Sequence, residues 1–149
     1  MFEKMRGVWT KAIDPLVLRM GNLDPSVLTW TSLVLALVSF WLIAEADLDT
    51  NGAMMIGGGV VLILVAGVLD ALDGALARHQ GVAGPYGDFL DHTIDRVVDV
   101  GLLIAIGMNT AYVTDPSSGA VAAVLTLFGS YMGTQAQSVG LDRIYGGFS

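Results

Sequence analysis

Four long stretches with few or no charged side chains constrain this chain more than any other feature of its sequence. Three of them, 27–44, 52–69 and 117–141, have no charge at all. Each is about as long as the 17–25 residues that a helix needs to cross roughly 30 Å of hydrocarbon. The fourth, 87–113, carries aspartates in its first half and as a helix would be about 40 Å long. We therefore expect an all-α, polytopic integral membrane protein with four transmembrane helices.

Aspartate and proline set the start of the first expected span. Asp24 is expected to cap this helix and Pro25 to open it, since Asp is favoured at the N-cap and Pro at the first helical position. An amphipathic helix over residues 1–22 is expected to lie on the membrane surface before it. The transmembrane helices are expected at 25–46, 52–79, 87–113 and 117–141, in a single membrane domain of residues 1–149.

Lysine and arginine predict how the spans are oriented. They occur before the first span, between the second and third, and after the fourth, whereas the loops at 45–51 and 114–117 have none. Cytoplasmic loops carry the excess of these residues. Both termini and the connection between the second and third spans are therefore expected in the cytoplasm, in a multi-pass protein of the cell membrane.

Composition excludes two kinds of chemistry. The net charge is −7 with only seven Lys and Arg, so the chain lacks the basic surface by which proteins bind nucleic acid. It has no cysteine, which excludes disulfides and thiol chemistry.

Four aspartates gather at one end of the second and third expected spans. Asp70 and Asp73 are three residues apart, and Asp91 and Asp95 are four apart. These spacings place each pair on one face of a helix. The short, glycine-rich connection at 81–87 makes the two helices antiparallel neighbours. The two pairs are therefore expected to face each other near the cytoplasmic end.

Carboxylates in this position need compensation. An aspartate near the centre of a membrane helix costs about 2.5–3.5 kcal/mol. Protonation is one solution, but a divalent cation is the better one, and an all-oxygen ligand set favours Mg²⁺ or Mn²⁺. Four carboxylates suit two ions about 3.5–4 Å apart, which stabilise phosphoryl transfer. With Arg78 available for phosphate and Gly74 leaving room for a nucleotide, a two-metal diphosphate site is predicted.

This segment resembles the signature of a known family, the CDP-alcohol phosphatidyltransferases. The motif fixes eight positions over 26 residues, and the resemblance of the whole chain covers roughly residues 23–140. The segment "DPSVLTW" also resembles the start of the family's first span. The matching residues read Asp70-x-x-Asp73-Gly74-x-x-Ala77-Arg78, eight residues, then Gly87-x-x-x-Asp91-x-x-x-Asp95.

The resemblance implies a membrane enzyme that transfers a phosphatidyl-type group from a CDP-linked lipid to a hydroxyl acceptor and releases CMP. It implies that the four aspartates surround two divalent ions, with Asp95 as general base for the acceptor hydroxyl. It also implies that Gly74, Ala77 and Gly87 make room for the cytidine nucleotide and that Arg78 contacts a phosphate. A homodimer is expected on the same resemblance alone.

The chain departs from the family's pattern in two respects. Members usually have about six spans, whereas four are expected here, either because the sequence is a fragment or because the acceptor pocket is built in an unusual way. Where members that use phosphorylated polyols have "SY" followed by basic residues, this chain has Ser130 and Tyr131 followed by neutral Gln135 and Gln137. The tail "GLDRIYGG" resembles archaeal members that attach inositol phosphate or a related head group. The sequence does not decide whether the acceptor is inositol phosphate, glycerol phosphate or another alcohol.

Two other functions fit the aspartates alone. An intramembrane prenyltransferase also holds a diphosphate with aspartates and magnesium, but its motifs lie farther apart and lack the Gly-x-x-Ala-Arg that follows here. A cation transporter could use the carboxylates as a transit site, but it gives no reason for this Gly-x-x-Ala-Arg either. His79 and His92 lie off the motif, and we assign them no role.

Overall fold

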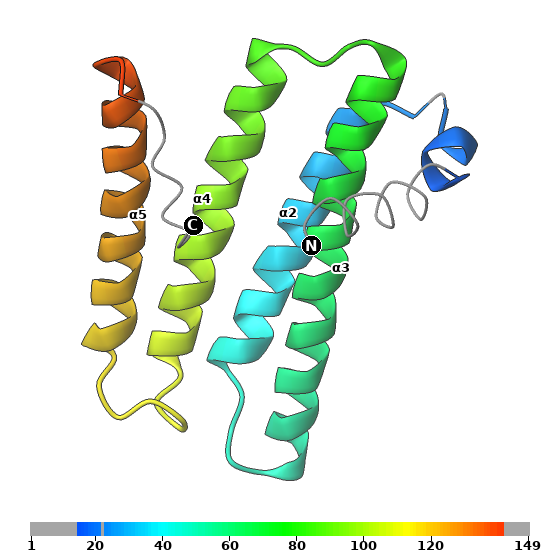
Figure 1. Cartoon of the computed structure of the whole chain (residues 1–149). Helices are drawn as coiled ribbons and strands as arrows, with labels where there is room; N and C mark the ends of the chain where they lie inside the picture. The colour runs from blue at the N-terminus through cyan, green and yellow to red at the C-terminus, as the bar shows by residue number, and fades with distance from the viewer. Residues whose placement is uncertain (1–14, 22, 142–149) are drawn as a thin grey trace, which may run out of the picture.

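Four long helices make up most of the described chain. A computed structural model describes residues 15–21 and 23–141 (Figure 1). A short helical segment at 15–19 precedes them, and most of the expected surface helix at 1–22 lies outside the described residues. No strand occurs in the part of the chain that the structure describes, which confirms the all-α class. The helices are α2 (Pro25–Ala44), α3 (Thr50–Gln80), α4 (Pro85–Met108) and α5 (Ser117–Ser138).

The first two of these helices begin at aspartate caps. Asp24 accepts a hydrogen bond from the Ser26 amide at 2.9 Å and Pro25 is the first helical residue, so this prediction is confirmed. Asp49 accepts from the Gly52 amide at 2.6 Å in the same way. Because of this cap, α3 begins two residues before its expected start at residue 52.

Glycines in the left-handed conformation follow the ends of α3 and α5. Gly81 has a φ of 69°, which glycine adopts without steric cost. The Val82 amide then donates to the Ala77 carbonyl at 3.0 Å. Gly140, with a φ of 81°, follows α5 in the same way, and this helix therefore stops at Ser138 rather than at 141.

A buried asparagine ends α4 five residues before the expected position 113. The Asn109 side-chain amide donates to the carbonyls of Ile43 and Ala46, at 2.6 and 2.9 Å. Its oxygen accepts from two backbone amides in the loop that follows. Since Asn109 is only 3% exposed, these bonds are shielded from water and tie the α4–α5 loop to the end of α2.

The helices assemble on α2. Both α3 and α4 pack against it, and α5 packs against α4 (Figure 1). The Phe40 ring of α2 lies directly against Gly101 of α4, where a Cβ would overlap it. A Cβ on Gly107 of α4 would lie 2.8 Å from the Cα of Gly119 in α5. Glycine therefore permits close approach on both sides of α4.

The helices α3 and α4 run antiparallel, as predicted, but they do not pack closely against each other. Their connection, 81–84, is short, and each rests on α2 instead. One buried apolar cluster joins the 15–19 segment, α2 and α3, and a second lies where α2 meets α3 and α4. Their members are Val17, Leu28, Leu72 and Leu76 in the first cluster, and Ala36, Phe40, Ala66 and Ala105 in the second.

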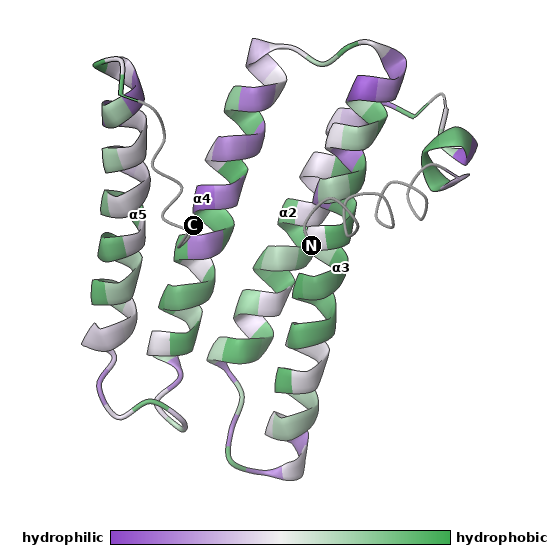
Figure 2. Cartoon of the chain, in the orientation of Figure 1, coloured by the Kyte–Doolittle hydropathy of each residue, from purple (hydrophilic) through white to green (hydrophobic). Residues whose placement is uncertain are grey.

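Large apolar side chains are exposed along much of the helices. In Figure 2 the hydrophilic residues gather in the half of α4 that follows the α3–α4 loop and at the adjacent end of α3. Among the described residues, α2 and α3 are the helices long and apolar enough to cross a membrane. The exposed large side chains include Trp30, Val34, Leu37 and Trp41 on α2, Leu64 and Val68 on α3, and Val124, Leu125 and Phe128 on α5.

Replacing Asn109 with alanine is expected to destabilise this fold. The carbonyls of Ile43 and Ala46 would lose their donors, and leaving a buried polar group unpaired costs about 1–3 kcal/mol. We expect the midpoint of thermal unfolding in detergent to fall for Asn109→Ala. The control Asn51→Ala, on the exposed first turn of α3, should leave it unchanged. Equal midpoints for the two variants would show that Asn109 does not anchor the loop.

Candidate functional site

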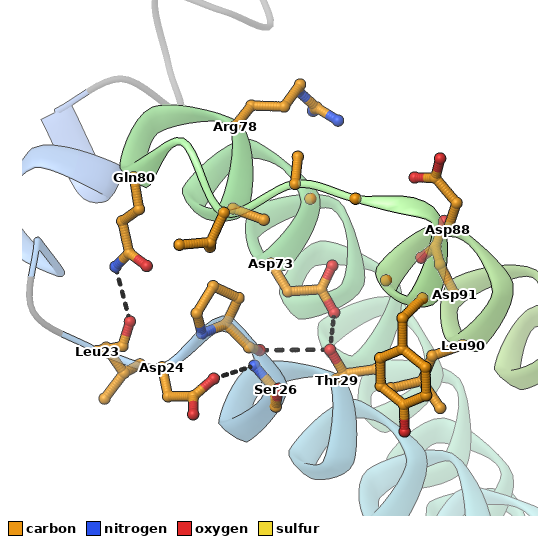
Figure 3. Close-up of a pocket in the computed structure, with 18 of the residues that line it drawn as sticks. Leu23, Asp24, Ser26, Thr29, Asp73, Arg78, Gln80, Asp88, Leu90 and Asp91 are labelled. Carbon is orange, nitrogen blue, oxygen red and sulfur yellow. Dashed lines mark hydrogen bonds between the residues drawn. The ribbon is translucent and has the colours of Figure 1, made fainter.

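A cavity of about 730 Å³ lies between α3 and α4, at the end of the molecule that holds their connecting loop. This volume is within the range of about 300–1,000 Å³ that is usual for small-molecule sites. The start of α2 contributes Pro25, Ser26 and Thr29 to its lining (Figure 3). Six of the eight expected site residues line it: Asp73, Gly74, Ala77, Arg78, Gly87 and Asp91.

Three of the expected metal ligands come together beside this cavity. Asp70, Asp73 and Asp91 each offer a carboxylate oxygen, and these oxygens all lie within 4.8 Å of one another. Asp73 is buried, with 5% exposed, whereas Asp70 and Asp91 are partly exposed. The carboxylates of α3 and α4 thus face each other even though the two helices do not pack together.

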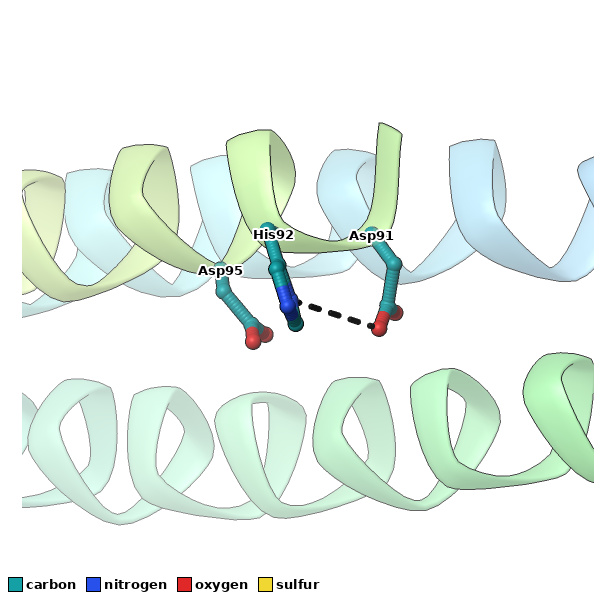
Figure 4. A group of neighbouring side chains, drawn as sticks. All are labelled: Asp91, His92 and Asp95. Atoms are coloured by element: carbon teal, nitrogen blue, oxygen red, sulfur yellow. Dashed lines mark ion pairs between the residues drawn. The ribbon is translucent and has the colours of Figure 1, made fainter. Parts of the chain in front are cut away.

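Asp95 lies one turn farther along α4. It belongs to a second group with Asp91 and His92, whose possible ligand atoms also lie within 4.8 Å of one another (Figure 4). Asp95 is ten residues from the start of α4 and Asp70 ten residues from the end of α3, so the two lie at similar depth. Since Asp91 belongs to both groups, the four aspartates form two overlapping groups rather than one.

One ion pair lies next to these groups and another lies within the second group. Nη2 of Arg96 lies 3.0 Å from Oδ2 of Asp99, so this aspartate is paired on its own helix, outside the carboxylate groups. Nδ1 of His92 lies 4.0 Å from Oδ2 of Asp91. The His92 side chain is 63% exposed, so solvent weakens this interaction, which also requires a protonated ring.

Thr29 of α2 is a site residue that the motif does not include. Its hydroxyl donates to Oδ2 of Asp73 in a buried hydrogen bond (Figure 3). The same hydroxyl lies 3.3 Å from the Pro25 carbonyl oxygen. The signal that could have found Thr29 is its place in "DPSVLTW", where a polar side chain lies near the start of an apolar span.

The small residues of the motif keep the cavity open. A Cβ on Gly87 would meet no atom within 4 Å, so the space beside this residue is free of protein. A Cβ on Gly74 would lie 3.3 Å from Nη1 of Arg78, which places the guanidinium beside the Gly74 backbone. Arg78 is exposed and forms no ion pair with any residue that the structure describes. Its charge is therefore available to an anionic ligand.

Gln80 holds in place the part of the cavity lining that precedes α2. Its side-chain amide donates to the carbonyl oxygens of Gly21 and Leu23, at 3.3 and 2.8 Å. These bonds tie the segment before α2 to the end of α3. Asp24, which follows this segment, lines the cavity and caps α2.

Residues 22–139 match the family described as CDP-alcohol phosphatidyltransferase. The chain belongs to this family. The match spans all eight expected site residues, and it decides between the three functions that the aspartates alone left open. This transferase therefore acts in phospholipid biosynthesis, with a CDP-alcohol as donor and a hydroxyl compound as acceptor.

Several curated proteins resemble the transferase over all or part of its length. An archaetidylinositol phosphate synthase from Methanothermobacter thermautotrophicus is 32% identical over 98% of this chain and 69% of its own. A phosphatidylinositol phosphate synthase from Cutibacterium acnes is 28% identical over 98% of this chain and 70% of its own. An archaetidylinositol phosphate synthase from Pyrococcus horikoshii is 43% identical over 48% of this chain and 35% of its own. No solved structure matches the chain.

Filling the cavity at Gly87 is expected to impair activity without unfolding the transferase. Gly87→Leu should fold normally, because its Cβ would meet no atom within 4 Å and leucine favours a helix over glycine. We expect CMP release from a CDP-linked lipid to fall about 100-fold, because a displaced nucleotide reacts far more slowly. Gly67→Leu, on an open part of α3 away from the cavity, is the control and should stay active. Full activity of Gly87→Leu would place the nucleotide elsewhere.

Proposed function

We propose that this transferase holds its CDP-linked lipid in the cavity between α3 and α4 and transfers the lipid-linked phosphate to an inositol phosphate. The observation that carries the proposal is the group of facing carboxylates, Asp70, Asp73 and Asp91, beside a cavity lined by the family's motif residues. The acceptor is supported by three relatives, each named for the synthesis of an inositol phosphate lipid.

The carboxylate groups fit divalent cations. Carboxylates this close repel one another unless a positive charge lies among them, and oxygen ligands select Mg²⁺ or Mn²⁺. We assign one ion to Asp70, Asp73 and Asp91, and a second to Asp91 and Asp95. Membership of Asp91 in both groups suits a ligand shared by two ions. When bound, the ions supply the positive charge that stabilises the diphosphate and the departing CMP.

The chain's own residues orient the substrates and accept a proton. Gly74, Ala77 and Gly87 leave room for the nucleotide, and Arg78 contacts a phosphate oxygen at the edge of the cavity. The acceptor hydroxyl oxygen attacks the phosphorus that carries the lipid. The bond from this phosphorus to the bridging oxygen of the diphosphate breaks, and CMP leaves with the electron pair. Asp95 accepts the hydroxyl proton as general base.

We further propose that all four helices, α2 to α5, cross the cell membrane in one domain. α2 and α3 support this by length and hydropathy, and α4 and α5 lie alongside them (Figure 1). The grouping of hydrophilic residues at one end, with Arg78 beside the α3–α4 loop, supports a cytoplasmic site. The surface helix at 1–22 and the homodimer stay predictions.

Release of CMP tests the reaction. The purified protein would be given a CDP-linked lipid and Mg²⁺ with inositol 3-phosphate, glycerol 3-phosphate, serine or inositol in parallel. We expect release with inositol 3-phosphate, abolished by EDTA and restored by Mg²⁺. Asp95→Asn should lower the rate by about 10²–10⁴-fold, because an amide cannot accept the proton.

The control for this experiment is Asp99→Asn, one turn farther along the same helix. Its ion pair with Arg96 is partly exposed, and such pairs contribute about 0–1 kcal/mol, so this variant should stay active. Release with glycerol 3-phosphate alone would refute the proposed acceptor. No release with any acceptor, from a protein that still binds the CDP-linked lipid, would refute the proposal that this chain holds the acceptor site.

The proposed topology can be tested with single cysteines, because the chain has none of its own. Val82→Cys, in the exposed α3–α4 loop, should react with a membrane-impermeant maleimide only after the cells are opened. Leu48→Cys and Thr114→Cys, in the two exposed loops at the other end, should react in intact cells. Labelling of all three from the same side would contradict four spans in this orientation.

A further inference from the structure

The Thr29 hydroxyl has two acceptors within reach but only one proton. Threonines in membrane helices often donate to the carbonyl four residues earlier, as Thr31 does to Val27 at 2.6 Å. In Thr29 the corresponding carbonyl, that of Pro25, is farther away at 3.3 Å. The Asp73 carboxylate is closer and, when ionised, is the stronger acceptor. The Thr29 hydroxyl therefore donates its hydrogen bond to Asp73, and this bond joins α2 to α3.

The surroundings hold both partners of this hydrogen bond in place. Thr29 is 7% exposed and Asp73 5%, so water cannot readily take the place of the hydroxyl. Their chain neighbours Leu28 and Leu72 belong to the same buried apolar cluster, which fixes the two backbones next to each other. The cap of α2 at Asp24 holds the start of the helix one turn away.

The hydrogen bond determines which oxygen of Asp73 is free. Oδ2 is taken by Thr29, and the other oxygen points away from Thr29 (Figure 3). Asp73 is also the most buried of the three carboxylates that come within 4.8 Å of one another. Its orientation therefore depends on Thr29 more than on solvent.

We propose that Thr29 is a positioning residue that holds Asp73 so that a single carboxylate oxygen is presented to a divalent cation. The proposal rests on the proposed function, in which Asp73 is a metal ligand. Mutating the hydrogen-bond partner of a metal ligand typically weakens metal binding by about 10–100-fold. Thr29 thus sets the affinity of the site for its ion, and it takes no part in proton transfer.

Binding of Mn²⁺ to the purified full chain, followed by the electron paramagnetic resonance signal of free Mn²⁺, tests this role without any substrate. Thr29→Ser and Thr29→Ala differ from each other only by the hydroxyl. We expect Thr29→Ala to bind Mn²⁺ about 10–100-fold more weakly and Thr29→Ser to bind like the unmodified chain. Thr31→Ala, which removes an exposed hydroxyl from the same helix, is the matched control and should bind normally.

Activity provides a second readout. The Mg²⁺ concentration for half-maximal CMP release should rise for Thr29→Ala by the same factor as the Mn²⁺ dissociation constant, whereas the rate at saturating Mg²⁺ should change little. Thermal unfolding shows whether each variant is folded. Should Thr29→Ala not fold, Thr29→Val, which keeps the shape of the side chain, takes its place.

Two results would overturn the inference. Unchanged Mn²⁺ affinity in Thr29→Ala would show that the hydroxyl does not matter to the ion. Equal loss in Thr29→Ala and Thr29→Ser would show that Thr29 acts only through packing. A failure of the proposed metal site is recognised separately, because the unmodified chain would then bind no Mn²⁺ or would bind it no better than Asp73→Asn.

Discussion

The packing of both α3 and α4 on α2 is the constraint on which the candidate site depends. Because each helix rests on α2, the two can carry facing carboxylates without packing against each other. The contact of Phe40 with Gly101 brings α4 close to α2 below the site. The Thr29–Asp73 hydrogen bond joins α2 to α3 at the site itself. The cavity is thus a product of three helices and not of the motif-bearing pair alone.

The arrangement of polar residues along the helices serves the same site. Along the helices, hydrophilic residues gather near the α3–α4 loop (Figure 2), whereas large apolar side chains are exposed on α2, α3 and α5. Carboxylates near a membrane boundary cost less than carboxylates at its centre. In the proposed reaction the nucleotide and the acceptor are water-soluble, whereas the lipid chains of the donor are apolar. A cavity at one end of apolar helices suits a reaction between a lipid-linked donor and a water-soluble acceptor.

Much of this arrangement could be predicted from local sequence pattern, because caps and helix faces depend on residues close together in the chain. Asp24 and Pro25 fixed the start of α2, and the three- and four-residue spacings of the aspartates placed each pair on one face. Interactions between distant residues could not be predicted. Thr29 and Asp73 are 44 positions apart, and the early end of α4 depends on Asn109 reaching carbonyls more than 60 positions away. The short α3–α4 connection predicted neighbours, but it held no information about the separation that α2 imposes.

The membership of Asp91 in both carboxylate groups has a thermodynamic consequence. Two ions that shared Asp91, as proposed above, would not bind independently, since the first to bind would orient the shared carboxylate and add its own charge beside the second. The free energy of coupling between them is the same in both directions, so each ion changes the affinity for the other by an equal factor. Loading of the site would then be cooperative or anticooperative according to whether preorganisation of Asp91 outweighs the repulsion between the two cations.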